Sequence, residues 1–318
     1  MIITVAICTL NRAESLGRTL QSLAEMRVPD GLVWEVVVVN NDCTDDTDAV
    51  IESFADGRLP IRREFQQQRG LSLARNRAVD TAKGDYIAWI DDDVIVEPGW
   101  LGAYADAFLR WPEAAVFGGP ITPRFVPPLP KWFAEAEPYL SGRVFARRDV
   151  DEEAEILLAE RRIPYGPNFA LRAIEQRAFL YDLELGPGPG RRRRAEETDV
   201  ILRVLGSGAT GRWVPGAQVE HWSQPNQETL EYVKDWFKTL GEAEAVIEAR
   251  QATVGPLWFG APRWLWRRLI TGWAGYLFYR VFSTPRAWVP YMAIRITASG
   301  AIQQWRSLGG HARIDPKS

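Results

Sequence analysis

The first 90 residues alternate between short apolar runs and segments with helical periodicity. The runs are rich in β-branched and aromatic residues and predict strands at residues 2–7, 36–39, 61–65 and 86–90. The segments between them predict helices at residues 14–24, 47–54 and 71–81. Strand, polar loop and helix in regular succession are typical of a doubly wound, mostly parallel α/β sheet, because parallel strands need crossover connections.

Polar loops follow three of these predicted strands, at residues 9–12, 40–46 and 91–93. The carboxyl ends of parallel strands meet at one edge of the sheet, where such folds bind nucleotides. We therefore expect the three loops to form one binding site. The loop after the first strand has no Gly-x-Gly-x-x-Gly, and the chain has no Gly-Lys-Ser/Thr. The dinucleotide-binding and P-loop classes would thus lack their phosphate-binding loops.

Three consecutive carboxylates, Asp91, Asp92 and Asp93, follow the fourth predicted strand. Carboxylates this close repel one another, and a hard divalent cation such as Mg²⁺ or Mn²⁺ would relieve the repulsion. The alternative is an acidic loop that caps the next helix, for which Pro98 suits the first turn. Arg75 is a candidate to neutralise a diphosphate beside such a metal, although its position equally fits a solvated arginine on a helix.

Gly and Pro interrupt the pattern after this point. The stretch at residues 116–130 is so rich in both that we expect no regular element there. Residues 147–162 predict a charged helix or a flexible segment, and residues 165–172 a strand beside a loop. The loop at residues 186–194 ends in four arginines, which suit phosphate or anionic lipid as well as a solvated loop.

A further helix and strand are predicted before residue 225. Glu196, Glu197 and Asp199 fall in the first turn of the helix, where acids are favoured, so capping is their simplest role. Residues 216–222 predict a strand that ends near His221, one of only two histidines. A lone histidine is more often structural than a metal ligand.

Seven short motifs occur in order along the chain, at residues 8–12, 38–47, 70–76, 84–93, 166–172, 196–203 and 219–221. Together they resemble family 2 of the glycosyltransferases, and the resemblance covers about residues 2–222. It implies a GT-A fold, which is a Rossmann-like, mostly parallel doubly wound sheet. It also implies a nucleotide-diphosphate sugar donor, a divalent metal ion and inversion at the anomeric carbon.

The resemblance implies which residues bind the sugar donor. Thr9, Asn11 and Asn41 would line the nucleoside pocket, with Arg75 near the base or the diphosphate. The other positions that match the family's donor-binding residues are Leu10, Arg12, Asp42, Asp91, Asp92 and Asn168.

It also implies the metal ligands and the catalytic base. Asp93 would hold the metal ion, His221 would complete its shell, and Asp91 would contact the ribose or the metal. Glu197 matches the family's general base. Glu196 and Asp199 are the alternatives, because this acidic cluster can be aligned with a shift of one or two positions.

Two residues depart from the family's pattern. Leu10 stands where a tyrosine commonly stacks on the base, and Asn41 stands where an acid often meets it. An amide both donates and accepts hydrogen bonds, whereas a carboxylate only accepts them. The departures bear on the choice of nucleotide, and a UDP-sugar is the donor that we expect.

Composition fits a folded protein of one large domain with an appendage, or of two modest domains. The 318 residues are 46% hydrophobic and 25% charged, and the net charge of -3 gives no overall attraction to nucleic acid. We predict that Cys8 and Cys43, the only cysteines, are buried reduced thiols. The apolar run at residues 2–7 is too short for a signal peptide, which predicts a cytoplasmic protein.

The C-terminal end has a different composition. Residues 227–250 predict a helix, and residues 254–310 contain seven arginines and six tryptophans but no Asp or Glu. Their longest mainly apolar run, residues 269–282, is shorter than the roughly 20 residues that span a bilayer. Tryptophan and arginine among aliphatics suit helices in the lipid headgroup region, so we expect peripheral association with the inner face of the cell membrane. The alternative is a helical bundle packed on the catalytic domain or on a second subunit of a homo-oligomer.

We therefore expect a GT-A catalytic domain at residues 1–225 and a helical, Trp- and Arg-rich extension at residues 226–318. The expected function is inverting, metal-dependent transfer of a hexose to a hydroxyl of a glycan or lipid-linked acceptor, in cell-surface polysaccharide or glycolipid synthesis. One alternative is a nucleotidyltransferase, which would usually have a Gly-rich triphosphate loop. Another is a non-catalytic sugar-nucleotide-binding protein, which would not need the acids at positions 91, 93 and 197.

Overall fold

The computed structural model describes residues 1–158, 162–190, 193–250 and 255–309. The chain forms two compact units. The first, here called the sheet unit, comprises Met1–Arg124, Ala146–Arg191 and Glu196–Trp222. The second, here called the helical unit, comprises Phe125–Phe145, Arg192–Ala195 and Ser223–Ser318. The division after Trp222 lies near the expected one, but the segment at residues 125–145 was expected in the first domain and belongs to the helical unit.

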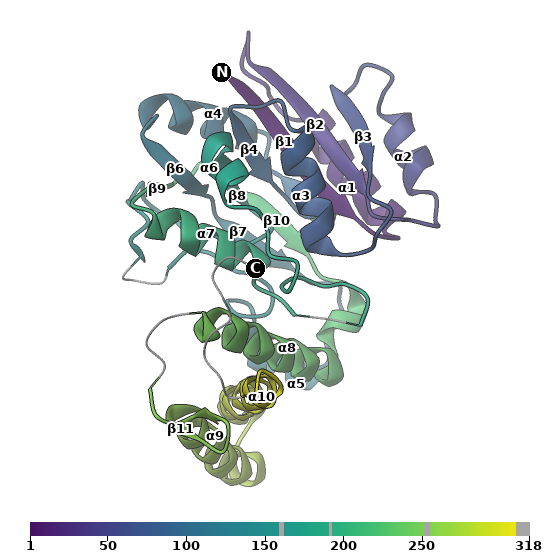
Figure 1. Ribbon diagram of the computed structural model, residues 1–318. Coiled ribbons are helices and arrows are strands. Elements are labelled where there is room, and N and C mark those ends of the chain that lie inside the picture. Colours follow the sequence, from purple (N-terminus) through teal and green to yellow (C-terminus); the bar gives the residue numbers. More distant parts are fainter. Residues whose placement is uncertain (159–161, 191–192, 251–254, 310–318) are drawn as a thin grey trace. The chain divides into compact units, whose positions relative to one another are not determined.

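A seven-stranded sheet forms the centre of the sheet unit, with strand order β3-β2-β1-β4-β8-β6-β9 (Figure 1). The strands are β1 (Ile2–Thr9), β2 (Val33–Asn40), β3 (Ile61–Phe65), β4 (Tyr86–Trp89), β6 (Ala114–Gly118), β8 (Phe169–Arg172) and β9 (Thr210–Trp213). The first four run parallel, and β8 is antiparallel to both of its neighbours. The expected mostly parallel α/β sheet is confirmed.

Helices cover both faces of this sheet, because its central strands are apolar on both sides. Val36 and Val38 of β2 lie in one core cluster, and Val37 and Val39 lie in the other. The first cluster includes apolar residues of α1 (Ala13–Ala24) and α4 (Trp100–Arg110). The second includes residues of α3 (Leu71–Thr81) and α7 (Glu196–Gly206). The sheet is therefore doubly wound, with shorter helices α2 (Thr47–Ser53) and α6 (Ala173–Ala178) completing it.

A second, three-stranded sheet has the order β5-β10-β7 and joins distant parts of the chain. Its strands are β5 (Val94–Val96), β7 (Ile121–Arg124) and β10 (Val219–Trp222). The prediction that residues 116–130 hold no regular element is wrong, because the end of β6 and all of β7 lie in this stretch. Gly and Pro residues connect β6 to β7. Each of these strands pairs with strands far along the chain, and a local sequence pattern does not predict such pairing. The described part of residues 147–162 forms no α-helix.

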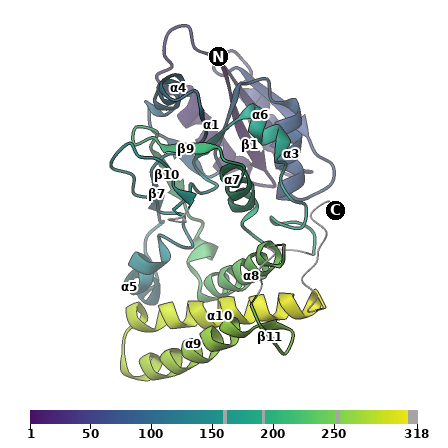
Figure 2. The same ribbon diagram turned by 60° about the vertical axis from the view of Figure 1, so that its left-hand side comes forward.

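The helical unit is built around α10 (Pro285–Ser307), which packs on α5 (Lys131–Leu140), α8 (Leu230–Ala249) and α9 (Arg263–Phe282). Figure 2 shows α10 between α8 and α9. A short 3₁₀ helix, η2 (Pro225–Glu228), precedes α8, and the pair β11 (Leu257–Trp258) and β12 (Ala261–Pro262) precedes α9. Among the described residues, no helix combines the length and the apolar character needed to cross a bilayer.

Glycines set how closely α8 and α10 approach. A Cβ atom on Gly241 of α8 would overlap the carbonyl oxygen of Thr297 in α10. A Cβ atom on Gly300 of α10 would overlap the carbonyl oxygen of Lys238 in α8. The two helices therefore touch backbone to backbone, and neither side can give way by turning a side chain.

We expect Gly241→Ala to lower the free energy of unfolding by about 2 kcal/mol, because the added methyl group forces α8 and α10 apart. Gly206→Ala is the matched control, since a Cβ atom on this helical glycine meets no atom within 4 Å. The control should leave stability unchanged or raise it by up to about 1 kcal/mol. Urea unfolding followed by circular dichroism measures both. Equal stability of the two variants would contradict the close crossing.

Candidate active site

The carboxyl ends of β1, β2 and β4 lie side by side, as expected for neighbouring parallel strands. The loops after β1 and β2 are bonded to each other. Asn11 has a left-handed backbone with φ of 54°, and its Oδ1 accepts a hydrogen bond from Thr44 N at 2.7 Å. The Cys43 thiol donates to Thr9 O at 3.4 Å and accepts from Asn11 N at 3.2 Å. These contacts fix one side of the candidate site.

Both cysteines are free thiols, as predicted, but they are half-buried and not fully buried. Cys43 takes part in the contacts between the two loops. Burial raises the pKa of Cys8 to about 12, so this thiol stays protonated at neutral pH.

Asp91, Asp92 and Asp93 follow β4 and form a turn, in which Val94 N donates to Asp91 O at 3.3 Å. Asp92 is buried and accepts a hydrogen bond from the Thr9 hydroxyl at 2.7 Å. Arg12 pairs with both neighbours, through Nη1 to Asp92 Oδ1 at 2.8 Å and through Nη2 to Asp93 Oδ2 at 2.7 Å. Thr9 and Arg12 therefore hold the acidic segment from the β1 loop.

Asp91 and Asp93 also come together with His221. One ligand atom of each lies within 4.8 Å of the others. The antiparallel pairing of β10 with β5 brings His221 opposite Val94, and Trp222 N donates to Asp93 O at 2.9 Å. Pairing of the two strands thus brings His221 beside carboxylates that lie more than 120 residues earlier in the chain.

The electrostatics of Asp93 suit a cation. Burial alone would raise the pKa of Asp93, but His221 and Arg12 lower it below its usual range, so the group is ionised. Asp93 Oδ1 lies 3.3 Å from His221 Nε2. In the described part of the chain it is nevertheless a buried oxygen without a well-aligned hydrogen bond. Two carboxylates and an imidazole form a ligand set that a divalent metal ion fits.

Arg75 is buried and lies at the centre of an aromatic cage. Its guanidinium carbon is 5.5 Å from the ring centre of Trp89, 5.8 Å from that of Phe169 and 5.3 Å from that of Tyr181. Nη2 lies 3.4 Å from Asp91 Oδ1. The interpretation of Arg75 as a solvated helix arginine is therefore wrong, because α3 turns this residue towards the sheet.

The same guanidinium reaches the acids of α7. Arg75 Nη2 lies 3.7 Å from the buried Glu196 carboxylate, and burial raises the pKa of Glu196 to about 7. Glu197 is half-buried, and a Cβ atom on Gly166 would lie 3.7 Å from Glu197 Oε1 and 3.3 Å from Arg75 Nη2. The missing side chain of Gly166 thus leaves room for both groups.

Asp199, the third acid, is bonded along its own helix. Arg203 Nε donates to Asp199 Oδ2 at 2.7 Å, an i,i+4 ion pair in α7. The three candidate bases therefore lie in three environments: Glu196 is buried, Asp199 is paired, and Glu197 is half-buried beside Gly166.

Asn168 supports the site from within the protein. Its Oδ1 accepts hydrogen bonds from Trp100 Nε1 at 3.0 Å and from the Tyr104 hydroxyl at 2.9 Å. Its Nδ2 donates to Pro120 O at 2.9 Å and to Ala217 O at 2.7 Å. The side chain is fully buried and all of its hydrogen-bonding groups are used. Asn168 therefore has no group to offer a sugar donor, and it joins the segments that lead into β7 and β10.

Asn41 is also bonded internally. Its Nδ2 donates to Gln66 O at 3.0 Å and Gln68 O at 2.9 Å, and its Oδ1 accepts from Gly70 N at 2.8 Å. The side chain shapes the loop from β3 to α3, a role that the motif alone did not indicate.

The remaining predicted residues lie on the loops after β1 and β2. The Leu10 side chain is exposed. Asp42 has a left-handed backbone with φ of 61°, and its carboxylate accepts from Arg69 Nε at 2.9 Å. Arg69 was not among the predicted residues, because it stands before the Gly70 motif and outside it.

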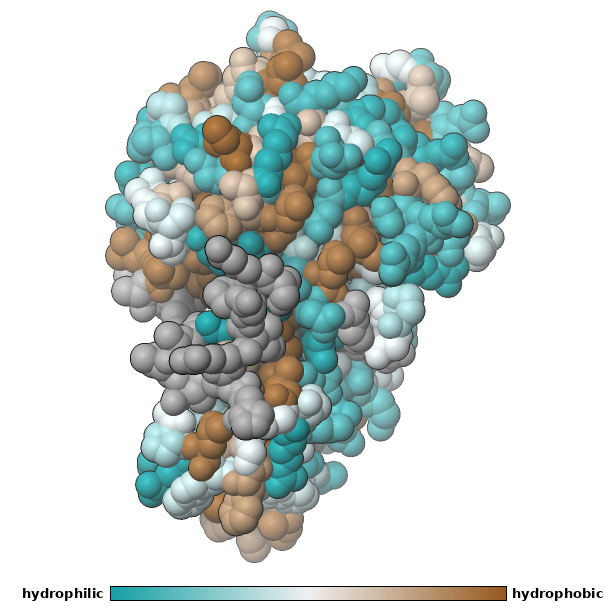
Figure 3. All heavy atoms as spheres, in the orientation of Figure 1, coloured by the Kyte–Doolittle hydropathy of each residue, from teal (hydrophilic) through white to brown (hydrophobic). Residues whose placement is uncertain are grey.

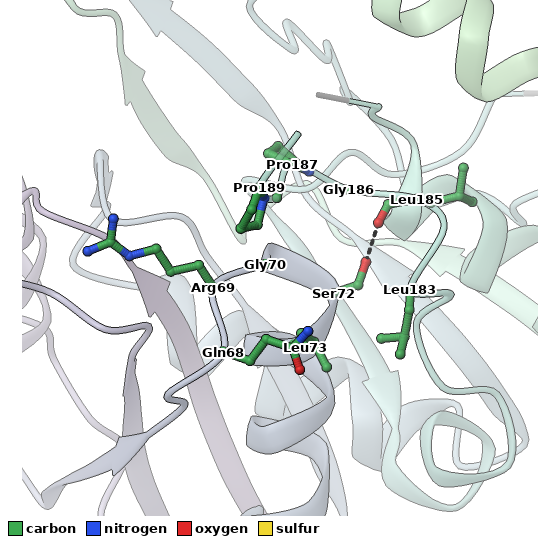
Figure 4. A pocket seen from close by; sticks show the side chains of 11 residues that line it. Gln68, Arg69, Gly70, Ser72, Leu73, Leu183, Leu185, Gly186, Pro187 and Pro189 are labelled. Atoms are coloured by element: carbon green, nitrogen blue, oxygen red, sulfur yellow. Dashed lines mark hydrogen bonds between the residues drawn. The ribbon is translucent and has the colours of Figure 1, made fainter. Parts of the chain in front are cut away.

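A pocket lies between the first turn of α3 and the loop at residues 183–189 (Figure 4). Leu71 N donates to Pro187 O at 2.8 Å, and the Ser72 hydroxyl donates to Leu185 O at 2.7 Å. The Pro187 carbonyl thus pairs one N–H group at the amino end of α3, where helix N–H groups have no partner within the helix. The pocket also includes Gly70, the residue bonded to Asn41.

The arginine-rich loop at residues 186–194 is described only in part, because Arg191 and Arg192 lie outside the described residues. Arg193 and Arg194 belong to the helical unit and contact its helices. Arg193 Nη2 donates to Gln304 Oε1 at 3.0 Å, and the Arg194 guanidinium lies 5.6 Å from the ring centre of Trp236.

Comparison with known proteins gives a family and two long alignments. Residues 4–157 match the family described as Glycosyl transferase family 2. The glucosyl-dolichyl phosphate glucuronosyltransferase of Haloferax volcanii is 29% identical over 211 residues, which cover 64% of this chain and 63% of that protein, less than two thirds of its length. The succinoglycan biosynthesis protein ExoM of Rhizobium meliloti is 28% identical over 253 residues, which cover 79% of this chain and 76% of that protein.

Two solved structures share the fold. The mannosyltransferase PcManGT from Pyrobaculum calidifontis, in complex with GDP-Man and Mn²⁺, matches with a TM-score of 0.60 and 17% identity over 93% of this chain and 85% of that one. Residues 1–349 of TarS from S. aureus, in complex with UDP, match with a TM-score of 0.53 and 17% identity over 99% and 94%. Identities this low show the fold alone, and it is the GT-A fold that the sequence predicts.

We expect Asn168→Leu to lower the free energy of unfolding by about 3 kcal/mol, because the leucine removes four buried hydrogen bonds, two to carbonyls, one from an indole N–H and one from a phenol. Tyr104→Phe removes only one of these bonds and should cost about 1 kcal/mol. Urea unfolding of both variants measures the difference. If Asn168→Leu costs no more than Tyr104→Phe, the amide does not join these segments.

Proposed function

Because the chain belongs to family 2 of the glycosyltransferases, we propose that it transfers a sugar from a nucleotide-diphosphate donor to a hydroxyl group of its acceptor, with inversion at the anomeric carbon. The observation that carries this proposal is the meeting of Asp91, Asp93 and His221 at the carboxyl edge of a doubly wound sheet. Ligands bind at this edge in such folds. A nucleotidyltransferase is disfavoured because the loop at residues 9–12 contains no glycine.

Asp93, His221 and Asp91 would hold a divalent metal ion, Mg²⁺ or Mn²⁺. The buried Asp93 Oδ1, which lacks a well-aligned hydrogen bond in the described chain, supports this assignment. Three protein ligands leave coordination positions for oxygens of a diphosphate. The bound ion would supply Lewis-acid stabilisation of the charge on the departing nucleotide diphosphate. The PcManGT complex contains Mn²⁺ with its sugar nucleotide, which supports the same ion type here.

The positive side chains around the carboxylates would assist the binding of the metal ion and the sugar donor. Arg12 neutralises Asp92 and one oxygen of Asp93, so the other Asp93 oxygen is left for the metal ion. Arg75 stays charged and lies against Asp91, where it would stabilise negative charge on the sugar donor. The aromatic cage fixes the direction of its guanidinium.

Glu197 is the proposed general base, which takes the proton from the acceptor hydroxyl on the side opposite the departing nucleotide. It is half-buried next to Gly166, where an acceptor can approach. Glu196 is the first rival, since a pKa of about 7 suits a base, but its burial against Arg75 keeps it from an acceptor. Asp199 is the weaker rival because it is paired with Arg203.

A UDP-sugar is the proposed donor, with Thr9, Leu10, Asn11, Arg12, Asn41 and Asp42 shaping the nucleotide side of the site. The PcManGT complex contains GDP-Man and the TarS complex contains UDP, so GDP- and UDP-sugars are the donors to compare for this protein. We propose a glycan or lipid-linked acceptor in polysaccharide or glycolipid synthesis. The names of the two relatives, a glucosyl-dolichyl phosphate glucuronosyltransferase and a succinoglycan biosynthesis protein, support this class.

The metal site is tested by thermal stabilisation. With Mn²⁺ present, UDP or GDP should raise the melting temperature of the wild type, because a ligand that binds only the folded state stabilises it. Asp93→Asn should abolish the metal-dependent part of this rise. Asp106→Asn, which changes an exposed carboxylate on α4, should keep it. A full metal-dependent rise in Asp93→Asn would exclude the assignment.

The base is tested by activity with the best-stabilising sugar nucleotide. Glu197→Gln should lower the rate of transfer about 10²- to 10⁴-fold while the stabilisation by metal and nucleotide persists. Glu196→Gln and Asp199→Asn are the comparison variants, made and measured in parallel. If Glu197→Gln transfers sugar at a near-normal rate while one of the others loses activity, the base is that other residue.

A further inference from the structure

Helix α9 exposes a row of large apolar side chains. Ile270, Leu277, Phe278, Val281 and Phe282, here called the apolar face of α9, are between 58% and 75% exposed. At 100° per residue they share one side of the helix. Figure 3 shows brown and tan spheres over the part of the molecule where Figure 1 draws α9. Contiguous exposed apolar surface of this kind marks an interaction site.

The packing of α9 on α10 fixes this exposure. Leu265 and Gly272 are the buried residues of α9. A Cβ atom on Gly272 would press on the backbone of Arg295, and one on Gly275 would overlap the ring of Tyr291. The small residues hold α9 close to α10, so the helix cannot rotate to bury its apolar face without losing this contact.

The surroundings of the apolar face are positively charged. Residues 254–309 contain seven arginines and no Asp or Glu. Several of these arginines stack on tryptophan rings: Arg263 over Trp258, Arg268 over Trp264, Arg280 over Trp288 and Arg295 over Trp273, at 4.3–5.5 Å from the ring centres. Within the described residues, no ion pair joins an arginine of α9 or α10 to a carboxylate. Their positive charge is therefore available to a partner.

We propose that the apolar face of α9 binds the surface of a lipid bilayer that contains anionic headgroups. The apolar side chains would enter the boundary between headgroups and acyl chains, where tryptophan is also favoured. The exposed Arg263 and Arg267 at the start of the helix would meet the headgroups, and each basic residue near an anionic surface raises affinity about fivefold.

Charge decides between a bilayer and a second copy of the chain. A symmetric dimer would bring two identical surfaces together, each with exposed arginines and no carboxylate to neutralise them. Like charges at such an interface repel, whereas anionic lipid is complementary. The proposal goes beyond the proposed chemistry. If the acceptor is lipid-linked, it also places the enzyme at the surface that holds the acceptor.

Sedimentation of the full-length protein with vesicles tests the proposal. The wild type should pellet with vesicles of phosphatidylglycerol and phosphatidylcholine, less so at high salt, and less with phosphatidylcholine alone. Leu277→Glu with Val281→Glu should weaken the affinity at least tenfold, because charges replace two inserted side chains. Leu109→Glu with Ile174→Glu is the matched control, since it adds the same charges at exposed apolar positions of α4 and α6. The control should bind as the wild type does.

A single charge change and the oligomeric state complete the test. Arg267→Gln should weaken binding to anionic vesicles about fivefold and leave binding to neutral vesicles unchanged. Wild-type protein that does not pellet, or an α9 double variant that pellets like the wild type, overturns the proposal. The proposal is also overturned if sedimentation equilibrium shows that the lipid-free wild type is a dimer and that the α9 double variant is a monomer. The apolar face would then bind a second copy of the chain. Stabilisation by Mn²⁺ and nucleotide should persist in the α9 variant, so the outcome is independent of the proposed catalytic function.

Discussion

The repulsion among three adjacent carboxylates governs how this protein is built. Asp91, Asp92 and Asp93 lie at the edge of a sheet, where water screens them poorly, and each is stabilised from a different direction. Arg75 of α3 lies against Asp91, Arg12 of the β1 loop bridges Asp92 and Asp93, and His221 of β10 approaches Asp93. Because every cation comes from another element, the acidic segment holds four parts of the sheet unit together.

The contacts of these three carboxylates separate structural from chemical roles. Asp92 is buried, and its carboxylate is bonded to Thr9 and Arg12. Asp91 and Asp93 each place an oxygen close to His221. Arg12 pairs with one oxygen of Asp93, and the other oxygen is left for a cation. The site thus keeps negative charge only where a cation and a sugar nucleotide would use it.

Arginine on aromatic rings recurs in both units with opposite consequences. In the sheet unit, a cage of three rings holds the buried Arg75 in one direction beside the acids. In the helical unit, arginines stack on tryptophans near the surface, where no carboxylate is available among residues 254–309. The same contact that orders a cation for chemistry in one unit keeps positive charge at the surface in the other.

The order of strands and helices up to residue 90 followed from the sequence, because each element there is defined by its own apolar pattern. The gathering of the polar loops at one edge followed as well, since parallel strands allow no other arrangement. Tertiary structure alone decided the rest. The strands within the Gly- and Pro-rich stretch at residues 116–130 form only through distant partners. Asn168 and Asn41 have their hydrogen bonds filled within the protein, and the environments of Glu196, Glu197 and Asp199 differ although their sequence context does not. The burial and the pairing of a side chain depend on residues that are close in space but distant in the chain. A local sequence pattern therefore does not predict them.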